Sequence, residues 1–262
     1  WYTTDTIYWI LVLCICRTTS QRCNNLKFSP SSMNMFAQCP AKFNYEKIEH
    51  VQPIFMERGK MDVGNDVHHA IQSYFSNSQE KPRKIELVEG IKRAWEQIIG
   101  DKYKSNRELQ HRVTQSLKNF TEFEITRRKT WESYLPTLVE ESLQNEELNG
   151  IVDFYSEEDE TVIDWKTGKK TELSLDDYRQ GEVYRKLLEE QGKKVSRVLF
   201  VVLSSGRVLN LPIQKENWIG QELLKIKTSI SNGNFKKKPS VLCGWCPYVI
   251  RCEFEGVELW QN

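Results

Sequence analysis

The sequence predicts an α/β fold, and the change of hydrophobic period along the chain is the main observation behind this prediction. Between residues 63 and 134, apolar side chains recur every three or four positions, which is typical of amphipathic helices. From residue 138, short apolar segments separated by polar turns are typical of strands. A helical period then returns over residues 176–190, between two groups of strands. Helices and strands therefore both contribute to the predicted core.

Helices are expected before the first strand. A short one begins at residues 29–30, where a serine can cap the helix and proline fits its first turn, and it ends near Cys39. The second covers residues 63–75, where Val63, Val67, Ile71 and Phe75 are spaced four apart. Two more are predicted over residues 87–98 and 109–134, and Trp95 is expected in the core.

The predicted strands follow in two groups. Residues 138–143, 148–155 and 161–165 form a meander, with polar turns at 144–147 and 156–160. After the helix at 176–190, residues 195–203 are apolar on both faces and therefore predict a central strand. Residues 206–213 pair with that strand. A last helix covers residues 218–230, with Trp218 expected in the core, before a basic stretch at 236–238.

Composition limits the classes of function. The 262 residues suffice for one large globular domain or two small ones, and 37 Lys and Arg against 36 Asp and Glu leave no global basic field. Acidic residues nevertheless concentrate between 139 and 182, which suits a protein that holds cations centrally and a polyanion around them. The longest apolar run, residues 7–16, is too short to span a bilayer. Residues 1–26 begin with Trp and lack a secretory signal pattern, so they are set aside as a segment of uncertain status.

The cysteines suggest a metal or cluster site. Seven is an odd number in a chain of this length, which argues against a secreted disulfide framework. Three of them form the pattern C-x2-C-x5-C: Cys243, Cys246 and Cys252. With Cys39 far upstream they give the four ligands that a tetrahedral zinc ion or a 4Fe–4S cluster needs. Cys23 competes with Cys39 for the fourth position, and the thiols at 14 and 16 are expected to be unrelated.

The sharpest chemical signal is a pair of aspartates in the hairpin at 148–165. If the chain turns between residues 158 and 159, Asp153 lies opposite Asp164, with Cβ atoms about 4.5–5.5 Å apart. Lys166 lies on the same face because side chains alternate along a strand. Two adjacent carboxylates repel each other unless a cation lies between them, and their oxygens favour Mg²⁺ or Mn²⁺. The set suits phosphodiester hydrolysis, although charges at a hairpin edge would produce the same pattern.

Two further groups of residues are uninformative by themselves. His68 lies on the predicted helix at 63–75, in an apolar stretch where its imidazole could complete a metal site. Gln180 and Tyr184 are four residues apart and therefore share one face of the helix at 176–190. A single histidine on a helix is more often a hydrogen-bonded structural residue.

In this order, the motifs resemble the RecB-type branch of the PD-(D/E)xK nucleases. The resemblance rests on His68, on G-x-x-D ending at Asp153, on D-x-K at Asp164 and Lys166, and on Q-x3-Y at Gln180 and Tyr184. Residues 28–43 resemble the N-terminal signature of that branch, and C-x2-C-x5-C resembles its C-terminal one. Asp at position 164 departs from the Glu of many relatives outside the branch, and the whole match covers residues 28–255.

The resemblance implies a fold and an activity. The fold is a restriction-endonuclease-like core, a central mixed β-sheet flanked by helices, in one domain over residues 27–262. Its helical part covers about 46–135 and its catalytic sheet about 136–213. The activity is that of an Mg²⁺- or Mn²⁺-dependent deoxyribonuclease, specifically an exonuclease. The implied metal ligands are His68, Asp153, Asp164 and the carbonyl of Trp165.

The resemblance also assigns roles to other residues. Lys166 is the catalytic base or a stabiliser of charge, Gln180 and Tyr184 position DNA or the Lys166 loop, and Glu140 is a weaker candidate for a further acid. As in the CRISPR-adaptation exonucleases, a 4Fe–4S cluster would join the N-terminal segment to residues 240–255, with structural Zn²⁺ as the alternative. Its ligands would be Cys39, Cys243, Cys246 and Cys252.

We therefore expect DNA as the partner, with single strands or free ends preferred, in recombination, repair, replication or CRISPR adaptation. The chain lacks a Walker motif, so any helicase or adaptation partner is a separate chain. Basic residues at 127–129, 169–170 and 236–238 are candidates for phosphate contacts. The expected location is the cytoplasm, away from membranes, for a protein encoded by a cell, a virus or a phage.

Two alternatives remain. One is a structure-specific endonuclease. The other is a non-catalytic DNA-binding or interaction module with a decayed site, against which the complete set His68, Asp153, Asp164 and Lys166 argues.

Overall fold

The computed structural model describes residues 26–54, 60–78, 84–214 and 217–254. The chain divides into two compact units. One unit contains the segments up to Met56, Glu146–Leu148 and from Glu216 onward, and the other contains Glu57–Asn145 and Asn149–Lys215. The first is helical and carries the clustered cysteines, and the second carries the sheet. A single domain over residues 27–262 stays a prediction.

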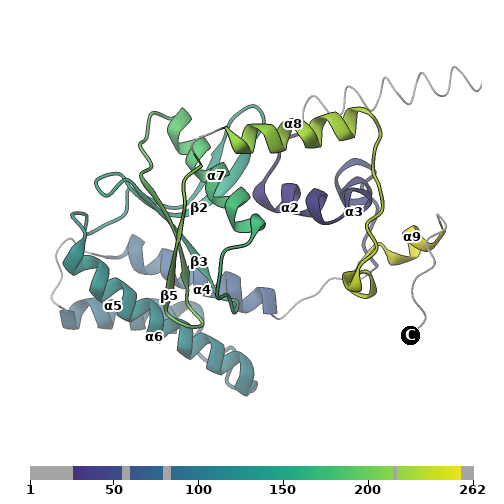
Figure 1. The fold of residues 1–262 in the computed structure, drawn as a ribbon. Coiled ribbons are helices and arrows are strands. Elements are labelled where there is room, and N and C mark those ends of the chain that lie inside the picture. The colour runs from purple at the N-terminus through teal and green to yellow at the C-terminus, as the bar shows by residue number, and fades with distance from the viewer. Residues whose placement is uncertain (1–25, 55–59, 79–83, 215–216, 255–262) are drawn as a thin grey trace, which may run out of the picture. The chain divides into compact units, whose positions relative to one another are not determined.

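The sheet unit is built on five strands in the order β1-β2-β3-β4-β5 (Figure 1). The three pairings β1–β2, β2–β3 and β4–β5 are antiparallel, whereas β3 and β4 are parallel, so the sheet is mixed. The bounds are β1 Leu138–Gln144, β2 Asn149–Ser156, β3 Thr161–Lys166, β4 Arg197–Val202 and β5 Arg207–Leu211. The parallel pair needs a crossover, which α7 (Leu175–Glu190) supplies. The α/β class is confirmed, and the arrangement is consistent with a restriction-endonuclease-like core.

Helices cover both faces of this sheet (Figure 1). On one face lie α4 (Lys60–Ser76), α5 (Lys84–Ile98) and α6 (Arg107–Thr130). Their apolar side chains form one buried core with Phe154, Ile163 and Trp165 from β2 and β3, and Trp95 lies in this core as expected. On the other face lies α7, which contacts β1 and β2. The strand that carries Asp164 and Lys166 is therefore held between two layers of helix.

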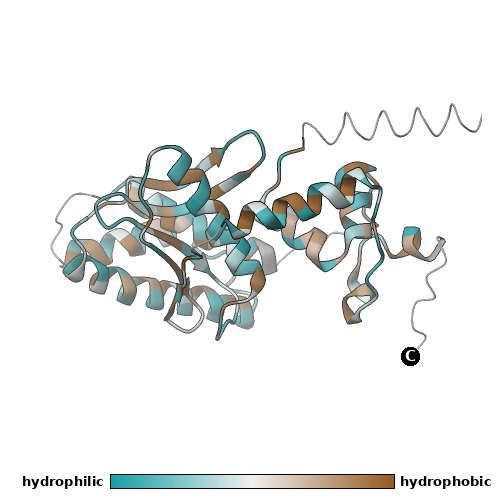
Figure 2. Ribbon diagram, turned by 45° about the horizontal axis from the view of Figure 1, so that its top comes forward, coloured by the Kyte–Doolittle hydropathy of each residue, from teal (hydrophilic) through white to brown (hydrophobic). Residues whose placement is uncertain are grey.

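The other unit is a small helical assembly. It contains α2 (Pro30–Gln38), α3 (Pro40–Phe43), a π-helical turn (Asn44–Ile48), α8 (Trp218–Ser231), a 3₁₀ turn (Val241–Trp245) and α9 (Val249–Phe254). Ser29 caps α2 by accepting from the backbone N–H of Ser32. Figure 2 shows hydrophobic and hydrophilic residues alternating along α8, whose buried face carries Ile219, Leu223, Ile226 and Ile230.

The expected helices and strands are all present, with shifts at their ends. The helix predicted to reach residue 134 ends at Thr130, because Trp131 is extended and Asp159 accepts the N–H groups of the next two residues. The π-helical turn and α9 were not predicted. Trp218 is half-buried rather than in a core. Residues 1–25, with Cys23 and the thiols at 14 and 16, lie outside the described residues. No described helix has both the length and the apolar character needed to cross a membrane.

Candidate active site

The β2–β3 hairpin has the predicted register, but its ladder stops just before the two aspartates. Phe154 pairs with Ile163, and the next two pairs keep the same offset, which places Asp153 opposite Asp164. The pairing of the two strands ends there. Instead, the backbone N–H of Trp165 donates to Oδ2 of Asp153 at 2.8 Å. A carboxylate thus takes the place of a main-chain acceptor where the two strands separate.

His68 reaches the same point from α4. Its Nδ1 lies 3.0 Å from Oε1 of Glu140 and 3.5 Å from Oδ2 of Asp153, and its Nε2 lies 3.0 Å from the carbonyl oxygen of Trp165. The opposite face of α4 anchors the helix, because Val67 and its apolar neighbours are fully buried. One ligand atom each from His68, Glu140 and Asp153 lies within 4.8 Å of the others, a spacing that suits a metal ion.

Glu140 has the weakest sequence signal of this group and a distinctive backbone. Its φ is 47°, in the left-handed region that a non-glycine residue occupies at a cost of about 1–3 kcal/mol. The neighbouring pairs Val139–Phe154 and Glu141–Val152 place it opposite Asp153, yet the ladder skips this pair. The carboxylate instead bonds to His68. The register of the β1–β2 hairpin was the missing information that would have identified it.

Asp164 and Lys166 point to α7, where Gln180 joins them. The ammonium of Lys166 lies 2.8 Å from Oδ2 of Asp164 and donates to Oε1 of Gln180 at 2.6 Å. The amide nitrogen of Gln180 donates to Oδ1 of Asp164 at 2.5 Å and to the hydroxyl of Tyr184 at 2.8 Å. An ammonium cannot accept and a carboxylate cannot donate, so one orientation of the amide satisfies both. Gln180 therefore fixes the relative positions of Asp164 and Lys166.

A glycine makes room for Tyr184. A Cβ on Gly150 would lie 3.0 Å from Cε1 of the tyrosine ring, closer than ordinary packing allows. The absence of a side chain lets α7 bring Tyr184 against β2, three residues before Asp153. The glycine of the G-x-x-D motif thus has a packing role.

The cluster carries excess negative charge in a buried setting. Burial raises the pKa of Asp153, and the nearby Asp164 raises it further. Burial lowers the pKa of His68, but Asp153 and Glu140 outweigh this effect and raise it to about 9. Burial likewise lowers the pKa of Lys166, whereas Asp164 raises it more, so the net shift is upward. Without a metal, the excess negative charge of the site therefore favours the protonated forms of these three groups.

One buried oxygen indicates where a further positive ligand fits. Oδ2 of Asp164 is inaccessible to solvent and has no hydrogen-bond partner, although Lys166 lies near it. The ion pair with Lys166 at 2.8 Å compensates the charge of this oxygen in part, and a second cation would compensate it further. Carboxylate oxygens with one imidazole are a donor set that suits a divalent cation such as Mg²⁺ or Mn²⁺. His68, Asp153 and Glu140 therefore fit the metal that the sequence motifs imply, whereas Asp164 does not belong to the group whose ligand atoms lie within 4.8 Å of one another.

The model of the PD-(D/E)XK nuclease superfamily matches residues 27–253. The chain belongs to this superfamily. The membership indicates a nuclease, whose substrate would be DNA, and nucleases of this superfamily usually use divalent metals. No individual curated protein matches the chain.

The four cysteines in the described part of the chain lie in its helical unit. Cys39, Cys243, Cys246 and Cys252 form no disulfide and line one hollow of about 190 Å³. Burial raises the pKa of the Cys246 and Cys252 thiols, and the neighbouring cysteines add to the effect. The hollow therefore contains all four of the thiols that the sequence pattern selects.

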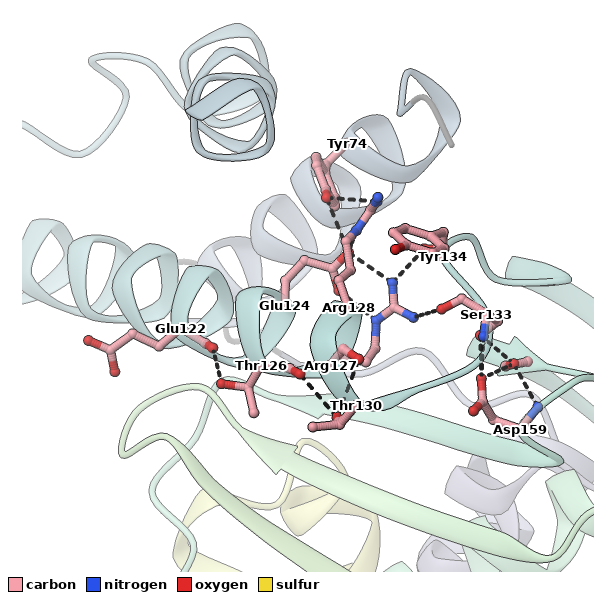
Figure 3. A network of polar contacts seen from close by, with 11 residues as sticks. Tyr74, Glu122, Glu124, Thr126, Arg127, Arg128, Thr130, Ser133, Tyr134 and Asp159 are labelled. Carbon is pink, nitrogen blue, oxygen red and sulfur yellow. Dashed lines mark hydrogen bonds and ion pairs between the residues drawn. The ribbon is translucent and has the colours of Figure 1, made fainter. Parts of the chain in front are cut away.

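Most of the expected phosphate contacts are engaged within the nuclease itself. Arg127 and Arg128 are buried in a polar network with Glu124, so the expectation that they bind DNA is wrong (Figure 3). Lys170 pairs with Asp177. Lys237 and Lys238 donate to the backbone carbonyls of Cys252 and Ala37, at 3.2 and 2.9 Å. Lys129 and Lys169 are exposed. A run of basic residues in the sequence does not distinguish side chains that pair within the protein from side chains that are exposed and can bind phosphate.

Proposed function

We propose that the chain is an Mg²⁺- or Mn²⁺-dependent deoxyribonuclease of the RecB-type branch. The observation that carries the proposal is the convergence of His68, Glu140 and Asp153, from α4, β1 and β2, beside the Asp164–Lys166 pair on β3. The cation would be held by His68, Asp153, Asp164 and the Trp165 carbonyl, with Glu140 as an additional ligand. When bound, it polarises the phosphate and lowers the pKa of a water molecule.

Lys166 acts as a stabiliser of negative charge. Its pKa is raised by Asp164, so it stays an ammonium at neutral pH, and a protonated amine cannot accept a proton. A charged Lys166 therefore favours electrostatic stabilisation of the phosphate oxygens over general-base catalysis. Gln180 is a positioning residue, because it bonds to Lys166, Asp164 and Tyr184 at once.

The finer parts of the proposal rest on the resemblance to the RecB-type branch. They are exonuclease action on single strands or free ends, and a role in recombination, repair, replication or CRISPR adaptation. A helicase or adaptation partner on another chain and a cytoplasmic location belong to the same proposal.

We further propose that the hollow of the helical unit holds a 4Fe–4S cluster on Cys39, Cys243, Cys246 and Cys252. Zn–S bonds of about 2.3 Å place the sulfurs of a tetrahedral zinc site about 3.8 Å apart. Among the described residues, no three of these sulfurs lie within 4.8 Å of one another. The preference for the cluster over zinc rests on the resemblance to the RecB-type branch. Visible absorbance of anaerobically purified protein, lost in Cys246→Ser, would support the cluster, whereas stoichiometric zinc without iron would contradict it.

The nuclease activity is tested with end-labelled single- and double-stranded DNA in Mn²⁺, Mg²⁺ or EDTA. We expect metal-dependent cleavage that Lys166→Ala lowers by about 10²–10³-fold, because a fixed charge next to the phosphate is lost. Lys92→Ala, an exposed lysine of α5, is the matched control. Equal cleavage by wild type and Lys166→Ala would show that the site is misplaced. Cleavage of circular single strands would indicate an endonuclease.

A further inference from the structure

We propose that a hollow beside the metal-binding group receives one strand of nucleic acid, and that Arg112 binds a phosphate next to the one cleaved. The inference rests on the proposed function, because it assigns the substrate path of the same site. It adds a residue that none of the sequence motifs contains.

The hollow lies in the sheet unit and opens on the candidate metal ligands. Its volume is about 650 Å³, within the range of about 300–1,000 Å³ typical of ligand sites. His68 and Glu140 form part of its wall, and α4, β1, β2, α6 and the loop after β3 all contribute to it. A phosphate that reaches these ligands therefore occupies the hollow, and the adjoining nucleotides touch its lining.

Arg112 supplies a cation to this lining. It lies on α6, is half-buried, and has no hydrogen bond or ion pair with any described residue. By contrast, Arg127 and Arg128 on the same helix each donate to Glu124. An unpaired guanidinium in a hollow is well suited to a phosphate, because its planar fork donates two parallel hydrogen bonds.

The charge of the site explains why a fixed cation is needed there. Glu140, Asp153 and Asp164 repel a polyanion, and Lys166 with a bound divalent cation neutralises these three charges without leaving a positive surplus. Arg112 adds positive charge in the same hollow. Strand binding should therefore depend both on the divalent cation and on Arg112.

An apolar side chain lines the same hollow. Ile151 lies on β2, two residues before Asp153, and is therefore on the same side of the strand. Its side chain is 53% exposed, unlike most large apolar residues of the sheet. A sugar or an unpaired base packed on it would remove this surface from water. This contact distinguishes a nucleotide strand from a free phosphate ion.

The test measures binding of a labelled single-stranded oligonucleotide in Ca²⁺ or EDTA over a series of salt concentrations. We expect Arg112→Ala to weaken binding about tenfold and to reduce the slope of log affinity against log salt by about 0.7, as for one lost phosphate contact. Arg112→Lys should recover part of the affinity. Ile151→Thr should weaken binding less and leave the slope unchanged, because no charge is removed.

The matched control is Arg93→Ala. Arg93 is an exposed arginine of α5 that lines a different hollow, so its removal makes the same change in net charge. Binding by Arg112→Ala equal to that of Arg93→Ala would overturn the inference. Retention of the Mn²⁺-induced increase in melting temperature by Arg112→Ala would show an intact metal site. Failure of the proposed function would be seen separately, as wild-type protein that binds the strand but does not cleave it in Mn²⁺.

Discussion

Two buried charged clusters in the sheet unit differ in how their charge is compensated. The first joins Glu124, Arg127 and Arg128 on α6 (Figure 3), and the second joins His68, Glu140, Asp153, Asp164 and Lys166. The α6 cluster carries excess positive charge, and the second cluster, here the candidate catalytic cluster, carries excess negative charge. The protein satisfies the first with its own groups and leaves the second short of cations.

The α6 cluster is almost fully satisfied by fixed partners. Arg127 donates to both oxygens of Glu124 at 2.7 and 2.9 Å and to the carbonyls of Ser133 and Tyr134. Its guanidinium carbon lies 5.2 Å from the ring centre of Phe154, where the face of an aromatic ring attracts a cation. Backbone carbonyls and an aromatic ring thus compensate the positive charge that Glu124 does not neutralise. The backbone N–H of Trp165 and the amide of Gln180 each donate one hydrogen bond to the carboxylates of the second cluster. The negative charge that remains suits a dissociable cation.

The largest effect is expected from breaking the α6 cluster. Glu124→Gln removes the charge that compensates two buried arginines, so the free energy of unfolding should fall by about 3–5 kcal/mol. Urea denaturation measures this change. Glu122→Gln, an exposed carboxylate on the same helix, should change stability by less than about 0.5 kcal/mol. Equal stability of the two variants would mean that the buried network is not what holds α6 in place.

A smaller effect is expected from disconnecting the two halves of the catalytic cluster. Gln180→Leu removes the amide that bonds to both Lys166 and Asp164, so kcat should fall about 10–100-fold, or about 1.4–2.7 kcal/mol. Tyr184→Phe removes a single acceptor of the amide and should cost less. Steady-state kinetics and melting temperatures of both variants test this order. A larger loss in Tyr184→Phe would assign the positioning role to the tyrosine instead.

The smallest expected effect is an increase in stability, caused by a substitution at Asp153. In EDTA, Asp153→Asn should stabilise the protein by about 0.5–2 kcal/mol, because it removes one of two neighbouring buried charges. Burial and Asp164 raise the pKa of Asp153, so the wild type is favoured while this group is protonated and loses stability as pH rises through its folded pKa. The advantage of the variant should therefore grow from about pH 4 upward.

Thermal denaturation over that pH range measures the difference. Asp101→Asn, at an exposed aspartate, is the control and should show no such trend. A destabilised Asp153→Asn would indicate that the hydrogen bond from Trp165 outweighs the repulsion between the carboxylates.

Sequence periodicity predicted the helices and strands because each has one buried face. The offset of the β2–β3 hairpin followed from its acidic turn, and this offset alone is enough to bring Asp153 and Lys166 to one site. The resemblance added His68, Gln180 and Tyr184, which come from distant segments that periodicity cannot bring together.

The features that the sequence did not predict depend on tertiary contacts. Glu140 reaches His68 through a left-handed backbone conformation that no local pattern announces. Arg112 and Arg127 are the same residue type on one helix, yet one lines a hollow and the other is buried under aromatic rings. Composition treats them alike, because the difference arises from which neighbours the folded chain supplies.

Trp165 belongs to the core and to the candidate active site at once. Its ring packs against Phe120 and Phe123, with centroid distances of 5.4 and 5.6 Å, while its peptide groups meet Asp153 and His68. The same residue therefore connects the buried core directly to the side chains of the candidate site. Heat that loosens the interior should therefore abolish activity at the same temperature, so inactivation and global melting of this unit should coincide, and a low-temperature precursor of inactivation should be absent.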